Sequence, residues 1–213
     1  RIKMTVGSEA TNLATLAASA ATGDNTYTVS ATGNVAVTTG TGDDTIAMGS
    51  TLTNGDTIDG GAHGTAATDG DMLQATITSN TTTTAAITVA NVEYFEFTNT
   101  GTAYVNAAGI TGASADLTVT GASTKTTYSN LGAIHTVGLG HKDEGGDSNT
   151  GITVLGLADA TGTSDSVTVN VYDSTSHTLQ ASGIETVNVG FSVTDTTISA
   201  SDLTVSALNA ASI

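Results

Sequence analysis

One short loop combines glycine and aspartate in a spacing that suits a hard cation. It reads Thr39-Gly-Thr-Gly-Asp-Asp-Thr-Ile-Ala47. This fits the nonapeptide G-G-x-G-x-D-x-U-x, where U is apolar, at every defined position except the first, where Thr39 replaces glycine. Glycine lets the backbone turn tightly and aim carbonyl oxygens inward, and Ca²⁺ takes about six to eight oxygen ligands. An ordinary β-turn is the alternative, but we expect a calcium site at Gly40, Gly42, Asp43 and Asp44.

A second stretch of the same kind follows closely. Residues 54–61 read Asn-Gly-Asp-Thr-Ile-Asp-Gly-Gly and, after extra residues at Thr65–Thr68, residues 69–73 read Asp-Gly-Asp-Met-Leu. Asp and Asn also favour plain turns, so a purely structural role stays open for both loops. Two such loops that each lead into an apolar strand favour calcium. The predicted ligands therefore extend to Asn54, Asp56, Asp59, Asp69 and Asp71.

The charge of the chain supports a cation as partner. Four basic residues stand against twenty acidic ones, which gives a formal net charge of −16 over 213 residues. A compact chain with this charge repels itself, and bound divalent cations would offset the repulsion; acids that are merely solvated are the alternative. The same charge argues against nucleic acid and anionic membranes as partners.

The sequence lacks the motifs of common catalytic sites. Its four histidines (His63, His135, His141 and His177) are far apart in the chain and do not have zinc-ligand spacing. There is no G-x-S-x-G elbow and no phosphate-binding P-loop. Aromatic residues make up only 4%, too few for the stacking platform of a glycosidase cleft. We expect that the chain is not an enzyme.

Short strands must position the two loops. Val, Ile, Leu and Thr alternate in brief runs bounded by Gly, Asn, Asp or Ser, which is typical of strands joined by tight turns. A short helix over Ser8–Ser19 is the less favoured option there, and no apolar run is long enough for a transmembrane helix. The predicted strands are Tyr27–Val29, Asn34–Thr38, Thr45–Met48, Leu73–Thr78, Ala86–Val89, Tyr94–Thr98, Leu117–Thr120, His135–Leu139, Ile152–Leu155, Val167–Tyr172, Glu185–Val189 and Leu203–Leu208.

Internal similarity appears on a longer scale. The strand that follows Asp71 resembles the one after Asp165, the segment at Glu93 resembles that at Glu185, and Leu117 lies in a match to Leu203. We interpret residues 1–37 as the end of a preceding β unit, 38–140 as a calcium-binding β unit, and 141–213 as a second, truncated unit. The predicted fold is all-β, a calcium-stabilised parallel β-solenoid (β-roll) or a set of stacked β-sandwich repeats.

The glycine–aspartate loops resemble those of the RTX (repeats-in-toxin) class of secreted proteins. The longer series of motifs resembles bacterial surface-layer (S-layer) proteins of the Caulobacter type. The resembling segments are 42–46, 55–61, 92–97, 160–167 and 183–189. The resemblance implies a β-rich, calcium-bound lattice protein at the bacterial cell surface, exported by type I secretion. It also implies a second set of calcium ligands, Asp165 and Glu185, with Asp71 and Glu93 as their counterparts.

The chain departs from this pattern in two ways. Its nonapeptides are few and imperfect, and neither end looks like an anchoring or secretion segment. We therefore expect an internal piece of a longer protein, whose other regions would anchor it, for example to a cell-surface polysaccharide. The loop 141–151, with Asp143, Glu144 and Asp147, is either another ion site or, the favoured interpretation, an exposed insertion.

The expected function is structural. Copies of the chain would associate with one another into a lattice with bound Ca²⁺. The main alternative is an RTX-type adhesin or biofilm-matrix protein. The calcium-binding tail of a secreted protease or lipase is a further possibility, for which longer nonapeptide arrays would be expected.

Overall fold

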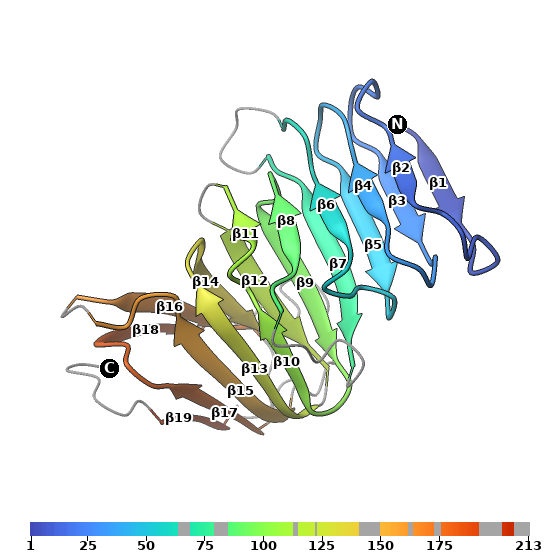
Figure 1. Ribbon diagram of the computed structural model, residues 1–213. Helices are drawn as coiled ribbons and strands as arrows, with labels where there is room; N and C mark the ends of the chain where they lie inside the picture. The colour runs from blue at the N-terminus through green and yellow to red at the C-terminus, as the bar shows by residue number, and fades with distance from the viewer. Residues whose placement is uncertain are drawn as a thin grey trace.

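The chain winds into a parallel β-solenoid of about seven turns (Figure 1). The computed structural model describes residues 1–63, 69–78, 85–112, 115–121, 123–140, 150–161, 164–172, 176–191 and 202–206. Every strand pairing within these ranges is parallel, and they contain no helix. The predicted all-β solenoid is confirmed, and of the two predicted architectures it is the solenoid that forms.

One sheet of nine strands, the main sheet, runs the length of the solenoid. In spatial order it contains β1 (Lys3–Val6), β3 (Thr26–Val29), β5 (Thr45–Gly49), β7 (Met72–Ile77), β9 (Tyr94–Asn99), β12 (Ala115–Thr120), β14 (Ile134–Leu139), β16 (Ser166–Val171) and β18 (Thr186–Phe191). Neighbouring strands of this sheet are about twenty to thirty residues apart in sequence.

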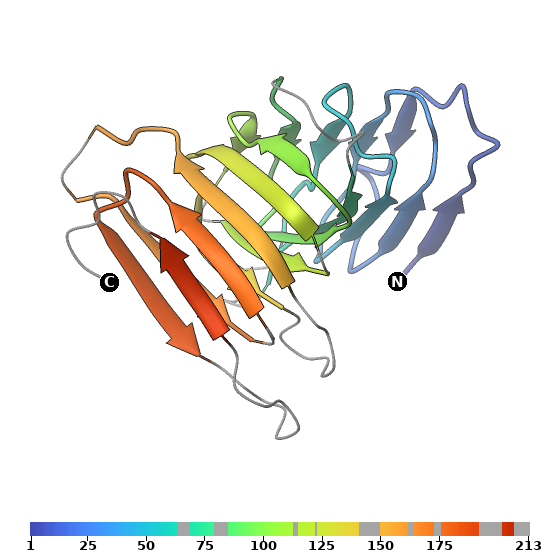
Figure 2. The ribbon, with the colours of Figure 1, turned by 90° about the horizontal axis from the view of Figure 1, so that it is seen from below.

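Two shorter sheets of five strands each complete the walls. The N-terminal side sheet contains β2 (Thr15–Ala17), β4 (Ala36–Thr38), β6 (Thr57–Asp59), β8 (Thr88–Ala90) and β11 (Ile110–Thr111). The C-terminal side sheet contains β10 (Ala103–Asn106), β13 (Ser123–Leu131), β15 (Thr150–Leu157), β17 (Ser176–Ala181) and β19 (Asp202–Ser206). Figure 2 shows these two halves at opposite ends of the molecule.

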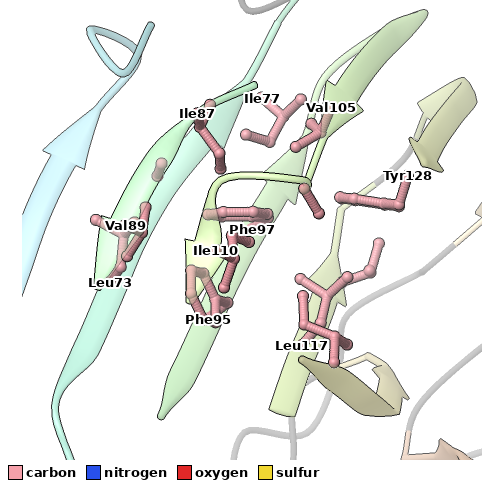
Figure 3. Close-up of a cluster of buried hydrophobic side chains, with 14 of the residues drawn as sticks. Leu73, Ile77, Ile87, Val89, Phe95, Phe97, Val105, Ile110, Leu117 and Tyr128 are labelled. Atoms are coloured by element: carbon pink, nitrogen blue, oxygen red, sulfur yellow. The ribbon is translucent and has the colours of Figure 1, made fainter. Parts of the chain in front are cut away.

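The core consists of apolar columns that follow from strand alternation. Because side chains along a strand point to opposite faces in turn, the parallel register stacks every second residue of one turn over its equivalent in the next. One inward column of the main sheet is Tyr27, Ile46, Leu73, Phe95, Leu117, Val137, Val169 and Val189. Figure 3 shows Leu73 and Phe95 of this column facing Val89 and Ile110 of the N-terminal side sheet.

The N-terminal side sheet ends and the C-terminal side sheet begins within a single turn of the solenoid. After β9, the chain forms β10 of the C-terminal side sheet and then β11 of the N-terminal side sheet. Tyr128 stacks there on Phe97, with ring centroids 6.3 Å apart, and its hydroxyl donates a hydrogen bond of 3.0 Å to Asn99. Burial raises the pKa of the Tyr128 phenol, so this hydroxyl stays a hydrogen-bond donor.

Several expectations about elements need correction. Residues 8–19 form turns and β2 rather than a helix, because Leu16 points into the solenoid from a strand. Seven strands were not predicted from the sequence: β1, β2, β6, β10 and β11 are only two to four residues long, and β13 and β17 are mostly polar. The predicted repeat match between Leu117 and Leu203 is wrong, because Leu117 lies in the main sheet and Leu203 lies in the C-terminal side sheet.

The predicted division into units at 37/38 and 140/141 stays a prediction. The first boundary falls within β4, and the second falls just after β14. Strand pairing continues on both sides of each boundary.

Candidate functional site

A ladder of side-chain acceptors runs along one corner of the solenoid. Asn25, Asp44, Asp71 and Glu93 each stand immediately before a strand of the main sheet. Each side chain accepts a hydrogen bond from the backbone N–H of the equivalent residue one turn earlier. The bonds are Ile2 to Asn25 at 2.7 Å, Asn25 to Asp44 at 2.8 Å, Asp44 to Asp71 at 2.7 Å and Asp71 to Glu93 at 2.9 Å. We call these four residues the acceptor ladder.

The ladder provides hydrogen-bond acceptors for the backbone N–H groups that are buried where each turn enters the main sheet. Asn25, Asp44 and Asp71 are at most 2% exposed, and a buried N–H group without a partner is costly. The next turn donates in the other direction, for example from Thr45 N–H to the Asn25 carbonyl at 2.8 Å. The ladder ends at Glu93, whose own N–H bonds to the Asp71 carbonyl at 3.1 Å.

Two predicted calcium ligands have both carboxylate oxygens engaged by the chain itself. Asp44 accepts from Asn25 N–H and Nδ2 at one oxygen and from Gly40 N–H, at 3.2 Å, at the other. Asp56 stands before β6 and accepts from Val35 N–H at 2.8 Å and Thr53 N–H at 2.7 Å. Asp56 is therefore the counterpart of the ladder residues in the N-terminal side sheet.

Asp71 differs from Asp44 because one of its oxygens has no hydrogen bond. Its Oδ1 accepts from Asp44 N–H, whereas its Oδ2 is buried without a hydrogen-bond partner. Burial raises the pKa of Asp71 to about 7, and the nearby charges of Asp44 and Glu93 add to this effect. His63 lies on the same corner, with Nε2 at 3.6 Å from Glu93 Oε1. Asp71 Oδ2 is thus a buried acceptor that can take a further partner.

A second, exposed ladder runs beside the first in the opposite sense. Asp43 N–H donates to Asp24 at 3.1 Å, and Gly70 N–H donates to Asp43 at 3.2 Å. Asp24 was missed from the sequence, although its place directly before a ladder residue, like that of Asp43, was a usable signal. Asp59 accepts from Gly61 N–H at 3.1 Å and from Asn91 Nδ2 at 2.8 Å.

The predicted loop glycines allow successive turns to approach closely. A Cβ at Gly40 would lie 2.0 Å from the Ala21 carbonyl oxygen, and one at Gly42, where φ is +116°, would lie 2.5 Å from the Gly23 backbone. Any side chain at either position would push neighbouring turns apart. These glycines are therefore needed for stacking whether or not their carbonyl groups bind an ion.

The remaining predicted residues lie in several places. Asn54 is exposed in the turn before β6, and Asp69 lies two residues before Asp71. In the C-terminal half, Asp165 N–H donates to Glu185 at 2.9 Å, the same bond that joins Asp71 to Glu93. The two pairs are thus joined by the same kind of bond. Asp143, Glu144 and Asp147 lie outside the described residues.

The twelve predicted metal ligands do not converge on one centre. Within the described ranges no group of three or more His, Cys, Asp or Glu side chains is placed to hold a metal ion by itself. A cation at the corner would also need backbone carbonyl oxygens, which Ca²⁺ accepts readily. The calcium sites stay a prediction.

The fold and the corner together define a parallel β-solenoid whose turns are joined by buried side-chain acceptors. Comparison with protein-family models, curated proteins and solved structures finds no match for this chain. The part of the chain that the structure describes holds no helix able to cross a membrane.

Proposed function

We propose that the chain is a non-catalytic structural segment of a bacterial surface-layer protein, located outside the cell, that folds with Ca²⁺ and associates with copies of itself. The observation that carries the proposal is the stack of acids along one corner. Strands of neighbouring turns lie about 4.8 Å apart, so Asp44, Asp71 and Glu93 bring like charges close together. No Lys or Arg occurs between Lys3 and Lys125 to offset them.

Ca²⁺ fits the free acceptors of this corner. Asp71 Oδ2 is buried without a hydrogen bond. A Cβ at Gly60 would lie 2.7 Å from that oxygen and 1.9 Å from the Asn91 carbonyl oxygen, so a carboxylate and a carbonyl oxygen lie around the same glycine. Mixed sets of this kind suit Ca²⁺. We propose Asp71, Glu93 and the Asn91 carbonyl as ligands, with Asp44 positioning Asp71 through its N–H.

Ion binding would then be coupled to folding. The acids repel one another without a cation, and a cation that binds only the folded chain adds its binding free energy to stability. A chain of this kind could leave the cell unfolded at low calcium and fold outside it. This step, like the surface-layer assignment, rests on the resemblance to Caulobacter-type S-layer proteins.

Calcium removal tests the proposal directly. The purified chain would be compared in Ca²⁺ and in the chelator EGTA by circular dichroism melting and negative-stain microscopy. We expect a higher melting temperature and sheet-like assemblies with Ca²⁺, and loss of both effects in EGTA. Magnesium at equal concentration is the control for ionic strength. Unchanged melting and persistent assemblies in EGTA would overturn the proposal.

A further inference from the structure

The outer face of the main sheet is almost free of charge. Lys3, Glu96 and Asp116 are the only charged residues in its nine strands, although the chain carries a net charge of −16. The acids instead gather in the turns that enter these strands, as at Asp43 and Asp44. The main sheet therefore opposes a second copy with little charge. The side sheets do the same, because their strands contain only Asp59, Lys125 and Asp202, so the choice between the faces depends on their area.

Most side chains on this face are small and polar, and Met72 and Tyr94 are the larger ones in a neighbouring outward column. One outward column contains Thr28, Ala47, Gln74, Glu96, Thr118 and Gly138 in register. Around the bulge in β5 the surface is slightly hollowed, between Gly49 of β5 and Thr98 of β9. Side chains of this size allow another sheet to approach to the usual distance of about 10 Å.

The area of its outer face favours the main sheet over the two side sheets as a contact surface. Nine strands of four to six residues cover about 43 Å by 18 Å, or roughly 750 Å². Two such faces would bury about 1,500 Å², close to the roughly 1,600 Å² of a standard stable interface. The N-terminal side sheet has strands of two or three residues, and its face covers only about 240 Å². The C-terminal side sheet covers about 500 Å² by the same measure.

We propose that a second copy of the chain packs on the outer face of the main sheet, main sheet against main sheet. This names the surface of the self-association proposed above and so rests on that proposal. Twisted sheets pack in this way with their strands about 30° apart. Glu96 and Asp116 lie within the face. Polar and hydroxyl groups around them would form most of the contact, which would therefore be largely uncharged.

Paired lysine substitutions test the face against a matched control. Thr28→Lys with Thr168→Lys places two charges on the main sheet, and Thr57→Lys with Thr88→Lys places two on the N-terminal side sheet. Sedimentation equilibrium in Ca²⁺ measures association, and circular dichroism checks folding. We expect the main-sheet pair to weaken association roughly a hundredfold or more, since two long, charged side chains would be desolvated and would keep the two sheets from packing closely. The side-sheet pair should associate like the unchanged chain.

Equal weakening by both pairs, or by neither, would overturn the inferred face while leaving self-association intact. A chain that stays monomeric without any substitution would instead overturn the proposed function, and the inferred face with it. Binding of the monomer to an insoluble polysaccharide through Thr28 would also overturn the second copy as occupant.

Cysteine cross-linking provides a test that does not depend on weakening the contact. The chain has no cysteine, so Thr28→Cys and Thr57→Cys each introduce one thiol. A short bis-maleimide should give cross-linked dimers with Thr28→Cys and few with Thr57→Cys. The reverse order of yields would contradict the inference.

Discussion

The two halves of the solenoid share the main sheet but close their corners differently. In the N-terminal half, the four bonds of the acceptor ladder join five successive turns, and the side strands contain only two or three residues. In the C-terminal half, the side strands reach nine residues, and the described ladder contacts reduce to the pair Asp165–Glu185. Short side strands offer few backbone bonds, so the N-terminal half depends more on buried side chains.

The halves also bury titratable groups of opposite kinds. Burial raises the pKa of Asp71 to about 7 and lowers the pKa of His177 to about 4. Asp71 therefore contributes stability that is fully present below about pH 4 and is lost as the pH rises through 7. The contribution of neutral His177 is present above about pH 6.5 and is lost as the pH falls through 4. The two halves should weaken at opposite ends of the pH range.

Removing one acid from each half should give the largest difference between the halves in the free energy of unfolding. Asp44→Ala leaves the N–H groups of Asn25 and Gly40 buried without acceptors, and we expect a loss of about 3–5 kcal/mol in the free energy of unfolding. Glu185→Ala removes one such bond, and the expected loss is about 1–2 kcal/mol. Urea unfolding measures both, with exposed Asp159→Ala as the control. Equal losses would remove the contrast between the halves.

Glycine substitutions compare how closely the turns pack. Gly61 has φ of +88°, and an added Cβ would lie 2.2 Å from the Gly40 carbonyl oxygen. Gly183 has φ of +77°, but its nearest contact would be 3.1 Å from the Ala160 side chain. We expect Gly61→Ala to cost about 3 kcal/mol and Gly183→Ala about 1 kcal/mol in unfolding free energy. A larger cost at Gly183 would show that the tighter stacking is in the other half.

The pH behaviour of the N-terminal half can be isolated with Asp71→Asn. The amide can still accept from Asp44 N–H but carries no charge, and Asn25 already acts as such an acceptor two steps earlier along the ladder. In EGTA at pH 8 we expect the variant to be about 2 kcal/mol more stable than the unchanged chain, and about equally stable at pH 4. Urea unfolding at both pH values tests this. A destabilised variant at pH 8 would contradict the effect of burial on Asp71.

The loss of stability of the C-terminal half at acidic pH should depend on His177. Its Nε2 lies 2.9 Å from Thr153 Oγ1 in the interior. His177→Gln keeps a hydrogen-bonding group but cannot gain a proton, so stability lost between pH 6.5 and 4.5 should shrink by about 1 kcal/mol. Urea unfolding at the two pH values measures the loss, with exposed His135→Gln as the control. An equal effect of both substitutions would show that His177 is not the acid-sensitive group.

The sequence was informative where apolar alternation was strong. The strands at Tyr27, Leu73, Phe95 and Val169 were predicted because each alternates Val, Ile, Leu or aromatic residues with polar ones. Strand β13 was missed because its sequence, STKTTYSNL, is mostly polar, and its place depends on pairing with β10 and β15. Such long-range pairing cannot be derived from local residue types.

The calcium ligands predicted from the sequence stay a prediction. Gly40, Gly42 and Asp44 lie where turns stack closely, but their spacing could not distinguish an ion ligand from an acceptor for backbone N–H groups. That distinction depends on the equivalent residue one turn away, which the sequence does not align. His177 belongs to no motif, and only the structure shows that it is buried.

Calcium titration of the chain and of Asp71→Asn at pH 8 tests most directly whether the acceptor ladder binds Ca²⁺ through Asp71. Calorimetry would give the stoichiometry and affinity, and hydrogen exchange would follow the N–H groups of Asp44 and Asp71. We predict that Asp71→Asn loses at least one bound ion, and that Ca²⁺ slows exchange at these two groups in the unchanged chain. Equal stoichiometry in both proteins, with no slowing at the acceptor ladder, would contradict the account.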